Sequence, residues 1–118
     1  MNAVSGLENA ARGFAALYQA NAALLADHAD WDCVLRLEAN DSPQQVGITI
    51  RRGEVQSISS EAQHADLVVT APLQTLLDIL ELRLNPNQPY LFGELTLRGD
   101  EADFMRIDYL ASTLCVQA

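Results

Sequence analysis

The sequence contains no lysine. All seven basic residues are arginines, at positions 12, 36, 51, 52, 83, 98 and 106. A chain without lysine has neither a Schiff-base lysine nor the lysine of a phosphate-binding P-loop. The arginines are scattered and are outnumbered by 16 acidic residues, which gives a formal net charge of −9. This balance disfavours binding to nucleic-acid phosphates and electrostatic docking on anionic membranes, so the sequence predicts no nucleic-acid partner.

Cysteine is scarce as well, and long apolar runs are missing. Cys33 and Cys115 are too few for a disulfide scaffold, and their apolar neighbours predict two buried thiols. The first residues lack the basic region and apolar run of a secretory signal. No stretch approaches the roughly 18 apolar residues of a membrane-spanning helix. We therefore expect a cytoplasmic protein with no integral membrane association, and the lack of lysine points to a bacterial source.

The sequence does contain enough apolar material for one core. Of its 118 residues, 49% are hydrophobic and 19% are charged, which argues against an intrinsically disordered chain. A chain of this length allows one domain. Residues 1–118 are therefore predicted to form a single domain.

The first part of the chain predicts a helix followed by four strands. Ser5 and Glu8 have the spacing of a capping box, and apolar residues then recur at helical spacing, which predicts a helix over residues 5–27. The hydrophobic period then changes to two, which is typical of strands. Three half-buried strands are predicted in an antiparallel meander, at residues 31–38, 46–51 and 54–58, with a turn at Arg52-Gly53. A fourth strand, 66–71, is apolar at successive positions, so we expect both of its faces to be covered.

The rest of the chain predicts two helices with a strand between them. Pro72 suits a first helical position and leucines follow at helical spacing, which predicts a helix over residues 72–82. The prolines within 85–89 predict a break. A fifth strand at 94–98 and a helix over 100–116 complete the order α-β-β-β-β-α-β-α. The predicted fold is α+β, a five-stranded, mostly antiparallel sheet covered by helices.

No catalytic or metal-binding pattern accompanies these elements. His28 lies among aspartates in Asp27-His28-Ala29-Asp30, but zinc-ligand spacings are absent, and a histidine at a helix end predicts a solvated turn. Cys33 alternates into the apolar face of its strand, and no nucleophile elbow occurs. The six glycines form no phosphate-binding loop. We therefore predict no enzyme, no metal and no cofactor.

The last helix carries more apolar surface than one packed stripe requires. One face holds Phe104, Ile107, Ala111 and Leu114, and a second face holds Met105, Tyr109 and Val116. Such a helix needs two partners, of which one is a packed core. The other is a ligand, a partner subunit or the first helix. A helix layer that does not close tightly on the sheet leaves an apolar cavity.

Two segments and the order of elements resemble the sterol carrier protein 2 lipid-binding family. Leu91-Phe92-Gly93-Glu94-Leu95-Thr96-Leu97-Arg98-Gly99-Asp100 resembles the family's glycine-bounded fifth strand and the start of its final helix. Ala65-Asp66-Leu67-Val68-Val69-Thr70-Ala71, with the leucine helix after it, resembles the fourth strand and following helix. The chain departs from the family at Arg83-Leu84-Asn85-Pro86, where a glycine and a short helix are common. Its last residues, Val116-Gln117-Ala118, are no peroxisomal Ser-Lys-Leu address.

The resemblance implies non-catalytic binding of a fatty acid, fatty acyl-CoA, sterol or isoprenoid in an apolar tunnel between sheet and helices. We expect a tunnel of roughly 400 Å³, whose emptiness would cost about 10 kcal/mol, so that the protein purifies with lipid. The predicted lining residues are Val69, Leu73, Leu77, Leu80, Phe92, Phe104, Tyr109 and Ala111, with the hydroxyl of Tyr109 as a polar contact. The alternative is an accessory module that forms a homodimer, or docks on a lipid- or quinone-metabolising enzyme, through the last helix. A small enzyme is a third hypothesis.

Overall fold

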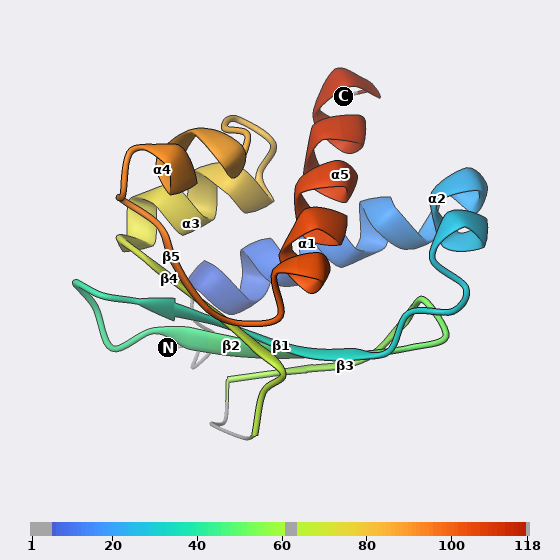
Figure 1. Cartoon of the computed structure of the whole chain (residues 1–118), viewed down its shortest axis with the longest axis horizontal. Helices are drawn as coiled ribbons and strands as arrows, with labels where there is room; N and C mark the ends of the chain where they lie inside the picture. The colour runs from blue at the N-terminus through green and yellow to red at the C-terminus, as the bar shows by residue number, and fades with distance from the viewer. Residues whose placement is uncertain (1–5, 61–63, 118) are drawn as a thin grey trace.

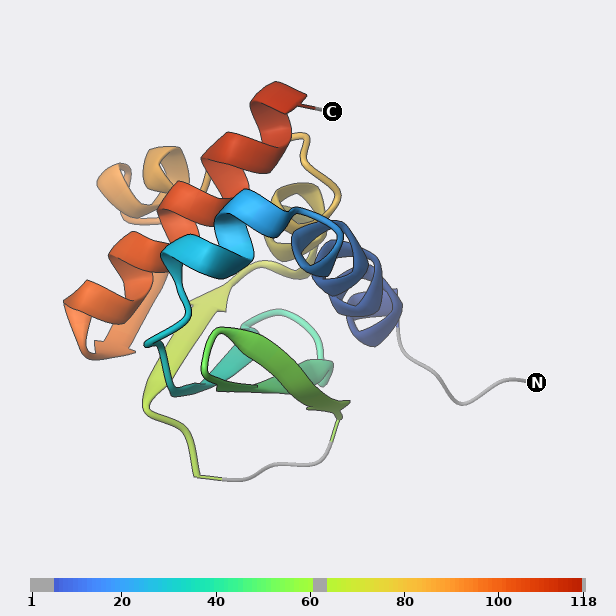
Figure 2. The ribbon, with the colours of Figure 1, turned by 90° about the vertical axis from the view of Figure 1, so that its right-hand side faces the viewer.

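The structure is a computed structural model and describes residues 6–60 and 64–117, with side chains to residue 115. Its elements follow the chain in this order: α1 (Gly6–Gln19), α2 (Ala22–Asp27), β1 (Cys33–Ala39), β2 (Gln45–Arg51), β3 (Glu54–Ser59), β4 (Leu67–Ala71), α3 (Leu73–Leu80), α4 (Asn87–Leu91), β5 (Thr96–Gly99) and α5 (Glu101–Gln117). The helices lie on one side of the sheet, and α5 begins near the sheet and rises away from it (Figures 1 and 2).

The five strands form one mixed sheet in the order β3-β2-β1-β4-β5. The pairs β1–β2, β2–β3 and β4–β5 are antiparallel, and β1–β4 is parallel. The predicted α+β class, with its meander of three strands and mostly antiparallel sheet, is confirmed. The predicted turn at Arg52-Gly53 is confirmed as well, because both residues have positive φ, as a two-residue type I′ hairpin requires.

The sheet has one apolar face because its strands alternate. Burial follows a period of two along β1 and β2, where the buried side chains of β1 begin with Cys33 and those of β2 with Val46. In β4 the successive residues Leu67, Val68 and Val69 are all buried, as predicted. The helices cover the face that carries the buried side chains of β1 and β2, so the core lies between the sheet and the helix layer.

The prediction of one helix over residues 5–27 is wrong. The helix ends at Gln19, and α2 begins after Asn21, whose side-chain oxygen accepts a hydrogen bond from the Leu24 amide at 3.1 Å. Asparagine is a favoured N-cap, so its side chain begins a new helix where alanine content alone predicts continuation. The predicted N-cap, Ser5, lies outside the described residues. Within them, the Leu7 amide donates to Oε1 of Gln44, before β2, at 3.0 Å.

The helix before residues 85–89 does end, at Leu80, as predicted, but the short helix α4 begins among the prolines, at Asn87. Pro86 is its N-cap, and Oδ1 of Asn85 accepts a hydrogen bond from the Asn87 amide at 3.0 Å. Pro89 fits in the first turn because amides there have no partner within the helix. The departure noted at Arg83-Leu84-Asn85-Pro86 therefore does not remove the short helix that the family resemblance implied.

The two cysteines differ, which corrects the prediction of two buried thiols. Cys33 is fully buried on the inner face of β1, whereas Cys115 is exposed near the end of α5. Burial, with smaller effects of the Asp103 and Asp66 charges, raises the pKa of the Cys33 thiol to about 12. Because the thiolate is the reactive form, Cys33 acts as an apolar core residue.

Candidate functional site

An apolar cavity of about 60 Å³ lies between the sheet and the helix layer. Nineteen residues line it, and all of them are aliphatic, aromatic, alanine or proline. They are Ala11, Phe14, Ala15, Tyr18, Trp31, Leu35, Leu37, Ile48, Ile50, Val55, Val69, Leu76, Ile79, Leu80, Pro86, Leu95, Phe104, Ile107 and Leu110. The lining has no charged side chain, so the site is suited to an uncharged, apolar group.

Each wall of the cavity follows from the local sequence pattern. The sheet supplies the floor through its alternating inward residues, among them Ile48 and Val69. Helix α1 supplies Ala11 and Ala15, two buried alanines whose small side chains leave volume that a larger residue would fill. Helices α3 and α5 supply branched side chains and Phe104.

Tyr18 and Trp31 are the two lining residues whose side chains carry polar atoms, and both atoms have partners. The Tyr18 hydroxyl donates a hydrogen bond to the backbone oxygen of Gly53. Nε1 of Trp31 donates to Oδ1 of Asp103 at 2.9 Å. Burial raises the pKa of the Tyr18 phenol, against a smaller lowering by the Arg106 charge, so the hydroxyl remains a donor. The side chains of the lining therefore offer a ligand no unpaired polar group.

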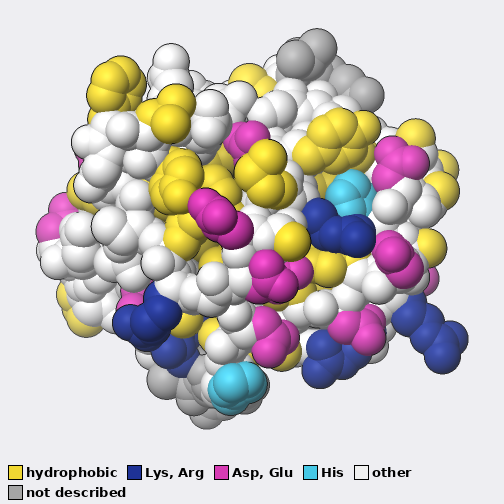
Figure 3. Space-filling view, viewed as in Figure 1, with side chains coloured by type: hydrophobic (Ala, Val, Ile, Leu, Met, Phe, Trp, Pro, Cys, Tyr) yellow, Lys and Arg dark blue, Asp and Glu magenta, His cyan; other side chains and the backbone are white. Residues whose placement is uncertain are grey.

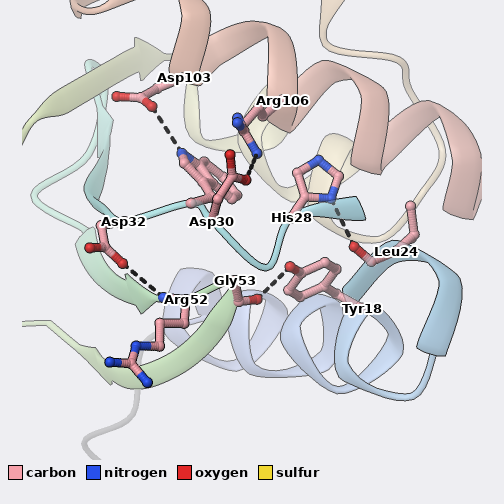
Figure 4. Close-up of polar contacts among 10 residues, drawn as sticks. Tyr18, Leu24, His28, Asp30, Asp32, Arg52, Gly53, Asp103 and Arg106 are labelled. Atoms are coloured by element: carbon pink, nitrogen blue, oxygen red, sulfur yellow. Dashed lines mark hydrogen bonds and ion pairs between the residues drawn. The ribbon is translucent and has the colours of Figure 1, made fainter. Parts of the chain in front are cut away.

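The imidazole ring of His28 packs against both Tyr18 and Trp31. The ring is buried, and its Nδ1 lies 2.8 Å from the backbone oxygen of Leu24 (Figure 4). Its centroid lies 6.3 Å from that of Tyr18, 5.7 Å from that of Trp31 and 5.9 Å from that of Tyr109. The prediction of a solvated histidine is wrong, because the ring folds back on its own helix and packs between aromatic side chains.

The structure brings three of the eight predicted ligand-binding residues into this cavity. Val69, Leu80 and Phe104 line it. Leu73 and Leu77, on the same helix as Leu80, are partly buried and pack against the core outside the lining. The helical periodicity identified the apolar face of α3 but did not show which part of that face borders the cavity.

The other three predicted residues lie elsewhere. Ala111 is fully buried outside the cavity lining. Tyr109 is half-exposed and contacts His28, and Phe92 is 85% exposed at the end of α4. The residues that α1 contributes to the lining, and those of the sheet other than Val69, were not predicted from the sequence. Their only signal was the alanine-rich face of the first helix, and alternating apolar residues in strands are also typical of an ordinary core.

The described residues were compared with the geometry of metal centres and of membrane-spanning helices. In residues 6–60 and 64–117, no three His, Cys, Asp or Glu side chains are grouped closely enough to hold a metal ion. No helix among these residues is long and apolar enough to cross a bilayer.

Residues 14–112 match the model of the SCP-2 sterol transfer family. No curated protein sequence shows significant similarity to the chain. Solved structures show the same fold. A UbiJ-SCP2 ubiquinone synthesis protein has a TM-score of 0.68 at 17% identity, with 91% of this chain and 93% of that chain covered. A crystal structure of sterol carrier protein 2 has a TM-score of 0.65 at 20% identity, with 92% of each chain covered.

A third structure, palmitated SCP2L2 from Aedes aegypti, has a TM-score of 0.55 at 17% identity, with 80% of this chain and 90% of that chain covered. At these identities the likeness establishes the fold, while the family model spans most of the sequence. The five-stranded sheet and the helix layer on one side of it agree with the fold of these structures. The chain belongs to the SCP-2 sterol transfer family.

Proposed function

We propose that the protein binds the hydrocarbon part of a lipid in the apolar cavity and carries it without chemical change. The candidate ligands are a fatty acid, a fatty acyl-CoA, a sterol or an isoprenoid. The observation that carries the proposal is the unbroken apolar lining, in which the polar atoms of Tyr18 and Trp31 already have protein partners. Val69, Leu80 and Phe104 are the predicted site residues that we assign to this lining.

Burial alone supplies enough free energy for such binding. One buried methylene contributes about 0.8 kcal/mol, so a chain of a dozen contributes roughly 10 kcal/mol before the costs of ordering. A charged headgroup must stay outside, because burying an unpaired carboxylate or phosphate in this lining would cost more than the chain gains. Selection therefore depends on the shape and length of the hydrocarbon.

A long hydrocarbon chain fits into the cavity only if the helix layer moves. The cavity of about 60 Å³ equals only about four or five water-sized spheres, well below the tunnel expected from the sequence. Helix α5 is fastened near its start by the Trp31–Asp103 hydrogen bond and by the 3.4 Å ion pair between Arg106 and Asp30. The ion pair is weak, but an outward shift of α5 would also expose buried side chains such as Phe104 and Leu110. The hydrocarbon of the ligand must therefore pack against these side chains and so offset the cost of the shift.

Two solved relatives support different parts of the proposal. The SCP2L2 structure from Aedes aegypti is described as palmitated, which supports a fatty-acid chain as one ligand class. The UbiJ-SCP2 protein is described as a ubiquinone synthesis protein, which supports the second candidate, an accessory module in lipid or quinone metabolism. The exposed Met105 and Tyr109 on α5 give that module an apolar surface for a homodimer or a partner enzyme.

Removing bound lipid is expected to lower the thermal stability. A ligand at about 100 times its Kd stabilises the native state by about 2.7 kcal/mol, which for a domain of this size raises Tm on the order of 10 °C. Native mass spectrometry of the freshly purified protein, followed by lipid extraction, identifies what is bound. A delipidated protein with an unchanged Tm and no affinity for a fluorescent fatty acid would contradict the proposal.

A further inference from the structure

The end of α4 carries the two most exposed large apolar side chains among the described residues. Leu91 is 71% exposed and Phe92 is 85% exposed, and they are consecutive in the chain. Hydrophobic side chains are visible on the molecular face formed by α4 and α5 (Figure 3). Isolated exposed apolar residues are common, but an adjacent leucine and phenylalanine in a 118-residue chain require an explanation.

The backbone holds this pair firmly in place. The Phe92 amide donates to the Gln88 oxygen at 3.1 Å, which completes the last turn of α4. The Pro89 oxygen accepts from the amides of Glu94 at 2.9 Å and Leu95 at 3.1 Å, so the chain turns back directly after Phe92. Leu95 is itself buried in the core. The exposure of Leu91 and Phe92 is therefore a fixed feature of the fold.

The same short segment borders the cavity on its inner side. Pro86 lines the cavity, and the Tyr90 ring lies 5.1 Å from the ring of Phe104, another lining residue. The segment thus has apolar side chains toward the cavity and apolar side chains toward solvent. It forms the wall between the cavity at Pro86 and the exposed Leu91 and Phe92.

The segment is also free of charge in a strongly acidic protein. Residues 84–92 contain no charged side chain, although the chain as a whole has a net charge of −9. Arg83, just before them, is paired with Asp78 at 2.8 Å and with Glu81 at 2.6 Å. A surface that docks here therefore desolvates no ion of the segment itself. The exposed carboxylates of Glu94 and of Glu101, which accepts a hydrogen bond from the Tyr90 hydroxyl at 3.0 Å, lie beside it and must stay in water. The docked surface must therefore carry little negative charge.

We propose that the end of α4 docks on an uncharged lipid surface, with Leu91 and Phe92 inserted among the lipids of a zwitterionic bilayer. A stable protein partner requires an interface of about 1,200–2,000 Å² with matched hydrogen bonds, far more than the end of α4 offers without the separate surface at Met105 and Tyr109 of α5. A lipid surface requires only apolar side chains that enter it and uncharged polar groups at headgroup level, such as Asn87 and Gln88. If the proposed lipid binding holds, the wall at Pro86 and Phe104 is where a lipid would pass between bilayer and cavity.

Flotation with vesicles of pure phosphatidylcholine tests this docking. The wild-type protein is expected to float with the vesicles, and Leu91→Ser and Phe92→Ser are each expected to weaken binding by about tenfold. Leu17→Ser, which changes a half-exposed leucine of α1, is the matched control and should bind as wild type does. Vesicles that also contain phosphatidylglycerol should bind more weakly at low salt, and added salt should reduce the difference.

The vesicle assay uses no cavity ligand, so its outcome is separate from that of lipid binding. Absence of wild-type flotation, or equal loss in the Leu17→Ser control, would overturn the docking proposal even if the cavity binds fatty acid. Wild-type flotation that Phe92→Ser leaves unchanged would overturn it as well. A change of oligomeric state in Phe92→Ser without any vesicle binding would instead assign this surface to a second copy of the chain. Unchanged Tm values in the serine variants confirm that they are folded.

Discussion

Replacing Ala15 by leucine is expected to weaken lipid binding by about fiftyfold while leaving the ligand-free protein as stable or more stable. Ala15 is buried on α1 and lines the cavity, so leucine adds three carbons where a ligand would lie. Losing contact with about three methylenes removes roughly 2.4 kcal/mol of binding free energy. Filling the cavity of about 60 Å³ stabilises the ligand-free protein by up to about 1.4 kcal/mol.

Ala111→Leu is the matched control, because Ala111 is an equally buried alanine outside the lining. There the larger side chain overpacks the core, and we expect a loss of about 1–3 kcal/mol in stability with nearly unchanged affinity. Denaturant midpoints and fatty-acid titrations of both delipidated variants measure the two effects. Equal losses of affinity would show that the ligand reaches Ala111, as predicted from the sequence. Unchanged affinity in Ala15→Leu would remove the cavity as the binding site.

Gly53→Ala is expected to destabilise the protein by about 2–5 kcal/mol. Gly53 has φ +78°, which costs an L-residue about 1–2 kcal/mol. An added Cβ would also lie 2.8 Å from the carbonyl carbon of His28, and relieving that overlap costs about 1–3 kcal/mol more. The Gly53 oxygen accepts a hydrogen bond from the Tyr18 hydroxyl, and the Gly53 amide donates one to the Trp31 oxygen at 2.9 Å. A displaced Gly53 backbone therefore also disturbs Tyr18 and Trp31, two residues that line the cavity.

Gly93 provides a control for the backbone effect alone. It has the same φ of +78°, but an added Cβ would meet no atom within 4 Å. Gly93→Ala should therefore cost only about 1–2 kcal/mol and leave ligand affinity unchanged. Urea denaturation of both variants separates the cost of the positive φ from the cost of the close contact with the His28 backbone. If the two variants lost the same stability, the close contact between Gly53 and the His28 backbone would not matter to the fold.

The sequence predicted the sheet well because strand patterns are local. The alternation that begins at Cys33 and Val46 specifies which face is buried, and Arg52-Gly53 specifies the turn after β2. The helix errors have one physical origin: single side chains of Asn21 and Asn85 accept backbone hydrogen bonds and begin α2 and α4. Such caps are hard to separate from loops in a sequence.

The cavity was predicted less completely because its shape depends on the spacing between layers. Helical periodicity identified Leu80 and Phe104 as inward-facing, and both line the cavity. It could not show that Ala15 and the sheet residue Ile48 face empty space rather than another side chain. Phe92 was predicted to face inward, but α4 ends in a turn that directs it outward.

Quenching of Trp31 by a brominated fatty acid tests the central claim most directly. Trp31 is the single tryptophan of the chain, it is buried, and it lines the cavity, so its fluorescence reports on ligand at that position. Titration of the delipidated protein with dibromostearic acid should quench the emission saturably at one ligand per chain, and Ala15→Leu should shift the curve to higher concentration. Saturable binding without quenching of Trp31, or no binding at all, would contradict the assignment of this cavity as a lipid-binding site.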